Sequence, residues 1–182
     1  HHLRNRLKEA LYDFIEQRQI GLIIPQNALT IPMHIPLGVA ITELIAETGI
    51  PTIAHHHDFY WERQRFMVNC VGDFLSLAFP PSLHSIQHVV INTPAARELS
   101  YRTGLSAHII PNVLNFEDPA PEIDEYNQDV RRDLGLEEDD IFILQPTRIV
   151  ARKGIEHAIE VVNRLNNPKA KLVISHSAGD EG

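Results

Sequence analysis

Short apolar runs rich in isoleucine and valine recur along the 182-residue chain, and amphipathic segments separate them. The runs occupy residues 21–25, 51–55, 88–93, 108–111, 141–146 and 171–176. Their apolar residues are nearly continuous, which is typical of strands buried on both faces of a parallel sheet. Strands that alternate with helices predict an α/β fold with mostly parallel sheets.

Three of the intervening segments have apolar residues at helical spacing, namely 3–15, 37–45 and 155–165. Gly49 is placed to end the second of these helices. Thr93 is expected to cap a further helix that begins with Pro94 and ends at Gly104. These signals support the alternation of strands and helices.

The segment 111–126 differs in composition from its surroundings. It holds three prolines and five acidic residues but no lysine or arginine, and no apolar period runs through it. Such a segment indicates a linker. We therefore expect two parts of α/β domains, residues 1–112 and 127–182, joined by a linker at 113–126, with a short helix over 127–134. A long surface loop within one domain is the alternative.

Charge and cysteine content exclude several classes of protein. Sixteen basic and 24 acidic residues give a net charge of −8, which argues against nucleic acid as a partner because polyphosphate requires a basic face. The single cysteine, Cys70, cannot form an internal disulfide; we expect it to be buried, in a cytoplasmic protein. No apolar run approaches the roughly 20 residues that span a bilayer, so no transmembrane segment is expected.

Three cations crowd the segment 145–156, which follows an apolar run and leads into a helix: Arg148, Arg152 and Lys153. Ligands bind beyond the carboxyl ends of strands in open α/β sheets, and a helix N-terminus favours an anion. Gly154 lets the backbone approach such a ligand closely. The segment therefore predicts a phosphate or diphosphate site, with a solvated basic loop as the alternative.

Three consecutive histidines and an aspartate follow the run at 51–55. Side chains alternate along an extended chain, so His55 and His57 can share one side, with Asp58 just beyond them. A histidine here suits hydrogen bonding to a polar substrate or proton transfer. A metal site and a purely structural role are the alternatives, and no further metal ligands have convincing spacing.

Five features follow one another along the chain: a strand ending in His-Asp (51–58), a strand-turn-helix unit (87–104), the step Ile110-Pro111-Asn112, Thr147-Arg148 with Lys153-Gly154, and a Lys-Leu-Val-Ile strand (171–174). In this order they resemble the retaining glycosyltransferases of family 4 (glycosyl transferases group 1), which have the GT-B fold. The resemblance implies Rossmann-like parallel sheets from parts of two GT-B domains.

The resemblance also implies an activity, namely transfer of a sugar from a nucleotide-sugar donor to a small-molecule acceptor with retention. It assigns Arg148 and Lys153 to the donor diphosphate, where they stabilise the leaving group. It assigns His57 to the donor sugar as the catalytic residue, with His55 and His56 as competitors. The donor is a substrate, and the cations take the place of a metal, so no cofactor and no metal ion are expected.

In this family the acceptor lies in the N-terminal domain, here residues 1–112, for which Asn27, Thr30 and His34 are candidate ligands, with a structural loop as the alternative for each. Asp58 is a further candidate for binding substrate. Residues 127–182 would begin the nucleotide-sugar-binding domain. The family's two-glutamate motif lies further along than Gly182, so we expect a central fragment, inactive alone, whose uncovered apolar surface promotes self-association. A non-catalytic phosphate- or nucleotide-binding α/β module and a metal-dependent hydrolase are the alternative functions.

Overall fold

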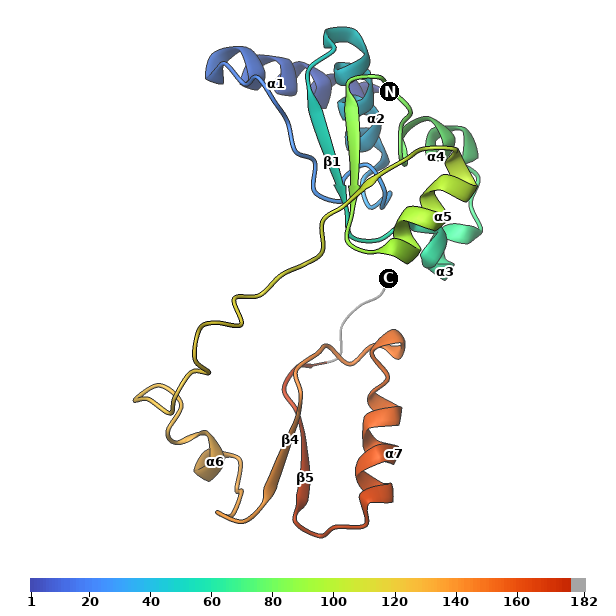
Figure 1. The fold of residues 1–182 in the computed structure, drawn as a ribbon. Coiled ribbons are helices and arrows are strands. Elements are labelled where there is room, and N and C mark those ends of the chain that lie inside the picture. The colour runs from blue at the N-terminus through green and yellow to red at the C-terminus, as the bar shows by residue number, and fades with distance from the viewer. Residues whose placement is uncertain (178–182) are drawn as a thin grey trace. The chain divides into compact units, whose positions relative to one another are not determined.

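A computed structural model describes residues 1–177 of the chain. The chain forms two compact units, unit 1 at His1–Asn115 and unit 2 at Phe116–Gly182 (Figure 1). The division falls inside the segment that the composition predicts as a linker. Each unit contains parallel strands that alternate with helices, so the predicted α/β class is confirmed.

Unit 1 is built on a parallel sheet with the strand order β1-β2-β3. These strands are β1 (Thr52–His56), β2 (Ile86–Val90) and the short β3 (His108–Ile109). Figure 1 shows β1 and β2 side by side, and Thr52 pairs with Ile86 while His56 pairs with Val90. The predicted runs at 51–55 and 88–93 are thus parallel strands of one sheet, although β2 begins two residues earlier than the second run.

The predicted strand at 21–25 is wrong as a regular strand. It forms only two isolated parallel bridges to β1, at Ile23 and Gln26. The N–H of Ile53 donates to the Ile23 carbonyl at 3.0 Å, and the N–H of His55 donates to the Pro25 carbonyl at 3.0 Å. Pro25 has no N–H to donate to β1, so the hydrogen bonding between residues 23–27 and β1 is interrupted at its centre.

Helices and short turns complete unit 1. They are α1 (His2–Arg18), α2 (Ile35–Thr48), η1 (Tyr60–Glu62), α3 (Gln64–Met67), α4 (Gly72–Ala78) and α5 (Thr93–Thr103). Gly49 and Gly104 end α2 and α5 in left-handed conformations, as predicted. The cap of α5 is Asn92 rather than Thr93, because the Asn92 side chain accepts a hydrogen bond from the Ala95 N–H at 2.8 Å.

The apolar core of unit 1 consists of three clusters. In the first, Ile41 and Ile45 of α2 pack with Ala54 and Ile86 of the sheet. The second joins Val39 of α2 to Leu75, Ala78 and Phe79. The third joins Phe59, Val90, Ala95 and Leu99, which anchors the chain just beyond β1. Phe59 is completely buried.

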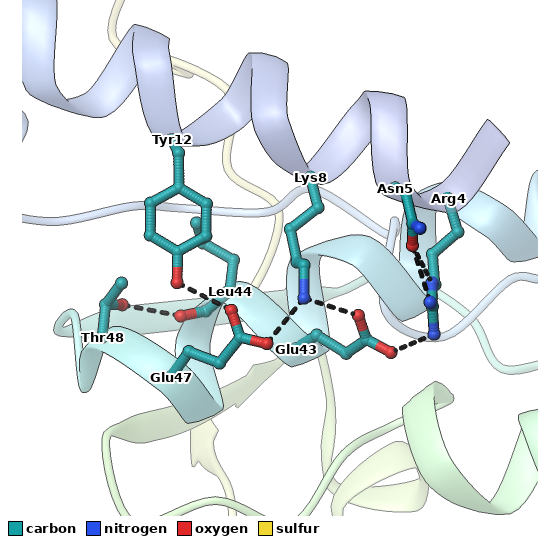
Figure 2. Close-up of polar contacts among 8 residues, drawn as sticks. All are labelled: Arg4, Asn5, Lys8, Tyr12, Glu43, Leu44, Glu47 and Thr48. Atoms are coloured by element: carbon teal, nitrogen blue, oxygen red, sulfur yellow. Dashed lines mark hydrogen bonds and ion pairs between the residues drawn. The ribbon is translucent and has the colours of Figure 1, made fainter. Parts of the chain in front are cut away.

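Helix α1 contacts α2 through polar side chains (Figure 2), while its partly buried Leu11 and Ile15 pack against the first core cluster. Arg4 pairs with Glu43 at 2.6 Å, and Lys8 lies 2.6 Å from Glu47. The Tyr12 hydroxyl donates to Glu47 at 2.8 Å. The hydrogen bond from Lys8, followed by that from Tyr12, lowers the pKa of Glu47. We call these five polar residues the α1–α2 ladder.

Unit 2 contains the parallel pair β4 (Ile141–Gln145) and β5 (Ala170–Ile174), as predicted. Helix α7 (Ile155–Leu165) connects them and runs beside β5 (Figure 1). The unit also holds α6 (Val130–Asp133), shorter than predicted, and the 3-10 turn η2 (Ala151–Lys153).

Two expectations about the surface have different outcomes. Cys70 is exposed, so the prediction of a buried cysteine is wrong. It stands between the short helices α3 and α4, outside all three apolar clusters. Within residues 1–177, no helix has both the length and the apolar content that a membrane span requires.

Candidate functional site

The carboxyl end of β1 separates the three consecutive histidines. The His56 side chain points into the core and is fully buried, and its Nε2 shares a hydrogen bond with Nδ1 of buried His88 at 2.9 Å. Burial, with a smaller contribution from His88, lowers the pKa of His56 to about 3. His56 is therefore a neutral core histidine, and its burial removes it from the histidines able to contact a substrate.

His55 and His57 lie on the other side of the chain, as the alternation predicts. Their ring centroids are 4.5 Å apart. The His57 side chain is exposed, and its Nε2 lies 3.2 Å from Oε1 of Gln26. Burial, and then the neighbouring His57, lower the pKa of His55. The exposed imidazole of His57 is thus the histidine best placed to meet a ligand.

Asn27 joins the segment beyond Pro25 to the end of β1. Its backbone has a left-handed conformation with φ of 59°, and its N–H donates to the His55 carbonyl at 2.9 Å. Its side-chain oxygen accepts from the His57 N–H at 2.9 Å and from the Asp58 N–H at 3.3 Å. The hydroxyl of fully buried Thr30 donates to the same oxygen at 3.1 Å.

Asp58 follows His57 and is held from two sides. Its Oδ1 accepts a hydrogen bond from the Asn27 side-chain amide, and its Oδ2 forms an ion pair with Arg63. The Arg63 and Asp58 side chains keep 31% and 24% of their exposure, so the pair remains in contact with solvent. The structure therefore brings three of the predicted residues together: Asn27, His57 and Asp58.

His34 has a different position, at the start of α2. It is the N-cap of α2, and its Nδ1 accepts a hydrogen bond from the Leu37 N–H at 3.1 Å. Gln26 and Arg63, by contrast, contact His57 and Asp58 but were missed by sequence reasoning. Arg63 lies five residues after Asp58, a spacing that could have suggested an ion pair, whereas no local signal identifies Gln26.

In unit 2 the predicted cations lie on the loop between β4 and α7. Arg148 and Lys153 are both exposed. The Gln145 side chain donates to the Thr147 hydroxyl at 3.1 Å and to the Lys153 carbonyl at 3.3 Å, which ties the two ends of the loop together. An exposed basic loop at the carboxyl end of a parallel strand is suited to an anion.

A short turn separates the cations of this loop from the helix that follows. Lys153 ends η2, and left-handed Gly154, with φ of 64°, stands between η2 and α7. A Cβ on Gly154 would lie 3.2 Å from Cδ2 of His157, so the glycine also permits a close approach of α7. In residues 1–177, no group of three or more His, Cys, Asp or Glu side chains is arranged to hold a metal ion.

Comparison with curated proteins finds relatives over most of the chain. The chain is 37% identical over 174 residues to mannosylglucosylglycerate synthase of Petrotoga mobilis, covering 93% of this chain and 40% of the relative. It is 38% identical over 161 residues to the protein of the same name from Thermotoga maritima, covering 87% and 35%. Mannosylglucosyl-3-phosphoglycerate synthase of P. mobilis is 30% identical over 192 residues, covering 98% and 36%.

No family model matches the chain. The aligned region spans between 35% and 40% of the length of these relatives. It includes both the end of β1 and the basic loop after β4, because it covers 93% of the present chain in the first comparison. The relatives are glycosyltransferases, and this chain is homologous to a part of them.

Proposed function

We propose that this chain is part of a retaining glycosyltransferase of family 4 with the GT-B fold, which transfers a sugar from a nucleotide-sugar donor to a small polar acceptor in the cytoplasm. The observation that carries the proposal is the 37% identity to mannosylglucosylglycerate synthase over 174 residues. The order of the sequence features and the two α/β units support it. The names of the relatives suggest a mannosyl donor and glucosylglycerate as the acceptor.

The donor diphosphate is assigned to the loop after β4. Departure of the nucleotide leaves negative charge on a phosphate oxygen, and fixed cations at that position lower the barrier. Arg148 supplies a planar fork for phosphate oxygens, while Lys153 supplies a compact charge. The exposure of both side chains and the constraint that Gln145 places on the loop support this role.

The reacting sugar and the acceptor are assigned to the end of β1. His57 is the catalytic candidate, since its imidazole is exposed and its backbone is held by Asn27. Asp58 is the candidate for acceptor hydroxyl groups, because a partly exposed carboxylate accepts several hydrogen bonds. His34 is dropped from this proposal because its ring nitrogen already caps α2.

The test is sugar transfer by the protein that carries this chain, with GDP-mannose as the first donor and glucosylglycerate as the acceptor. Arg148→Ala and Lys153→Ala are each expected to lower turnover by about a hundredfold or more, the scale of one lost transition-state charge contact. Product NMR should show the anomeric configuration of the donor. Arg164→Ala, which removes an exposed cation from α7, is the matched control and should leave turnover unchanged.

The alternatives give different results in the same experiments. A non-catalytic module would bind a nucleoside diphosphate, with affinity lost in Arg148→Ala, but would transfer no sugar. A metal-dependent hydrolase would lose its activity in chelator and would be indifferent to Arg148→Ala. Wild-type transfer rates in both loop variants would contradict the role proposed for Arg148 and Lys153.

A further inference from the structure

The strongest unassigned feature of the molecule is the way Asn27 is bonded at the end of β1. Its side-chain oxygen accepts from two backbone N–H groups, of His57 and Asp58, and from the Thr30 hydroxyl. An amide oxygen has two lone pairs, so three donors saturate it. Asn27 therefore has no acceptor capacity left for a ligand, and a direct contact with substrate is confined to the second N–H of its side-chain amide.

The same residue also fixes a carboxylate. The Asn27 side-chain amide donates to Oδ1 of Asp58, while Arg63 binds Oδ2 from the other side. Each carboxylate oxygen has further lone-pair positions, and the Asp58 side chain keeps 24% of its exposure. The two protein donors therefore set the orientation of the carboxylate without using up its capacity to accept hydrogen bonds.

The backbone geometry explains why an asparagine stands at this position. Asn27 has φ of 59°, a conformation that asparagine tolerates better than most residues with a side chain. The turn it makes lies directly after the bridge between Gln26 and His55, so the amide is presented to the two residues that follow β1. Backbone and side chain together attach residues 26–27 to residues 55–58.

We propose that Asn27 is a positioning residue which, together with Arg63, directs the Asp58 carboxylate at the hydroxyl groups of a polyhydroxylated acceptor. Asp58 is then the residue that selects for hydroxyl-rich acceptors, and Asn27 and Arg63 act only through it. The proposal rests on the proposed function, because that function supplies an acceptor of this chemistry.

Two substitutions separate the tasks of Asn27. Asn27→Gly keeps the left-handed backbone accessible but removes every side-chain bond. Asn27→Asp retains an oxygen for the N–H groups of His57 and Asp58 but replaces the donor to Asp58 with a like charge. A merely structural role would make the glycine variant the more damaging of the two for every property measured.

The measurements are binding of glucosylglycerate by NMR titration and amide hydrogen exchange of residues 57–63, both on the complete chain. Asn27→Asp should keep native exchange protection at His57 and Asp58 but weaken glucosylglycerate binding by about tenfold or more, the scale of one charge-assisted hydrogen bond. Asn27→Gly should lose both the protection and the affinity. Arg63→Met should weaken binding, with partial rescue by Arg63→Lys.

Asn166→Gly is the matched control, since Asn166 is a left-handed asparagine in unit 2 with φ of 46°, and it should leave binding unchanged. Native-like affinity in Asn27→Asp would overturn the inference while leaving the proposed function intact. If the native chain binds a nucleoside diphosphate but not glucosylglycerate, the inference fails and the donor assignment stands. If it binds neither, both proposals fail.

Discussion

The buried pair of His56 and His88 should make the stability of unit 1 depend on pH. Burial is the main cause that lowers the pKa of both residues, to about 3 for His56, whereas an unfolded histidine titrates near pH 6.5. Between these values the unfolded chain binds more protons than the folded one. The free energy of unfolding is therefore expected to decrease as the pH falls below about 6.5, by up to about 1.4 kcal/mol per pH unit for each histidine.

Urea unfolding between pH 7 and pH 5, followed by the fluorescence of Trp61, measures this dependence. Carboxylates begin to contribute near pH 4.5, so the upper part of the range isolates the histidines. Replacing both residues, as in His56→Leu with His88→Met, should flatten the profile. His84→Gln changes an exposed histidine and should not alter the slope; a pH-independent free energy in the native protein would contradict the prediction.

For individual residues, the sequence predicts part of the site and misses the rest for a physical reason. The alternation of side chains along a strand places His55 and His57 together, and a strand end marks Asp58 as accessible. The contacts of Gln26 and Asn27 join residues about thirty positions apart. These contacts depend on the residue at which the segment around Pro25 pairs with β1 again. No periodicity in the sequence encodes that register.

In helix α2, Gly38 lies against the ring of Phe79. A Cβ added to Gly38 would lie 2.2 Å from Cζ of Phe79, whose side chain is only 2% exposed. Gly38→Ala should lower the free energy of unfolding by about 1–3 kcal/mol, because the overpacking outweighs the gain of about 1 kcal/mol in helix propensity. Chemical denaturation provides the measurement.

Gly72→Ala is the control for this substitution. Gly72 begins α4, and no atom lies within 4 Å of the position its Cβ would take, so the change should be neutral or stabilising. Combining Gly38→Ala with Phe79→Leu should recover part of the loss by making room for the methyl group. Equal stability of Gly38→Ala and the native chain would show that α2 and Phe79 can separate at little cost.

The α1–α2 ladder leads to a second expectation for the helices. Because α1 buries no residue completely, removing the acceptor charges of α2 should loosen it. In the double variant Glu43→Gln, Glu47→Gln, amide exchange across His2–Arg18 should be faster, while exchange in α2 changes little. Added salt should speed exchange in the native chain in the same way.

Glu9→Gln, on the exposed side of α1, is the control and should have no effect on exchange. Unchanged exchange in the double variant would assign the docking to the apolar contacts of α1.

At the scale of elements, the glycines that end α2 and α5 can be predicted from sequence, whereas the pairing of the first apolar run cannot. Gly49 and Gly104 stop their helices because the left-handed cap is a local property of glycine. The run at 21–25 shows the opposite case. Its apolar residues indicate burial, but strand pairing also requires backbone N–H groups. Pro25 lacks the N–H that a regular parallel pairing with β1 needs.

For the whole molecule, we expect self-association. The described part of unit 2 exposes about half of each of several large apolar side chains on its strands and helix, namely Ile141, Leu144, Ile159 and Val161. Exposed apolar surface of this kind favours contacts between molecules. Sedimentation velocity should show a mass that rises with concentration above 20.6 kDa, and Leu144→Lys should reduce the rise. A single 20.6 kDa species at all concentrations would contradict this expectation.

The parallel pairing of β1 with β2 also determines when unit 1 can fold during synthesis. Thr52 pairs with Ile86, so the partner of β1 leaves the ribosome more than thirty residues after it. Until then one edge of β1 has no partner strand, and His88, whose ring bonds to His56, has not been added to the chain. Such non-local pairing slows folding. The end of β1 therefore gains its neighbouring strand late, after residues 26–63, which carry the contacts of Asn27 and Asp58, have been made.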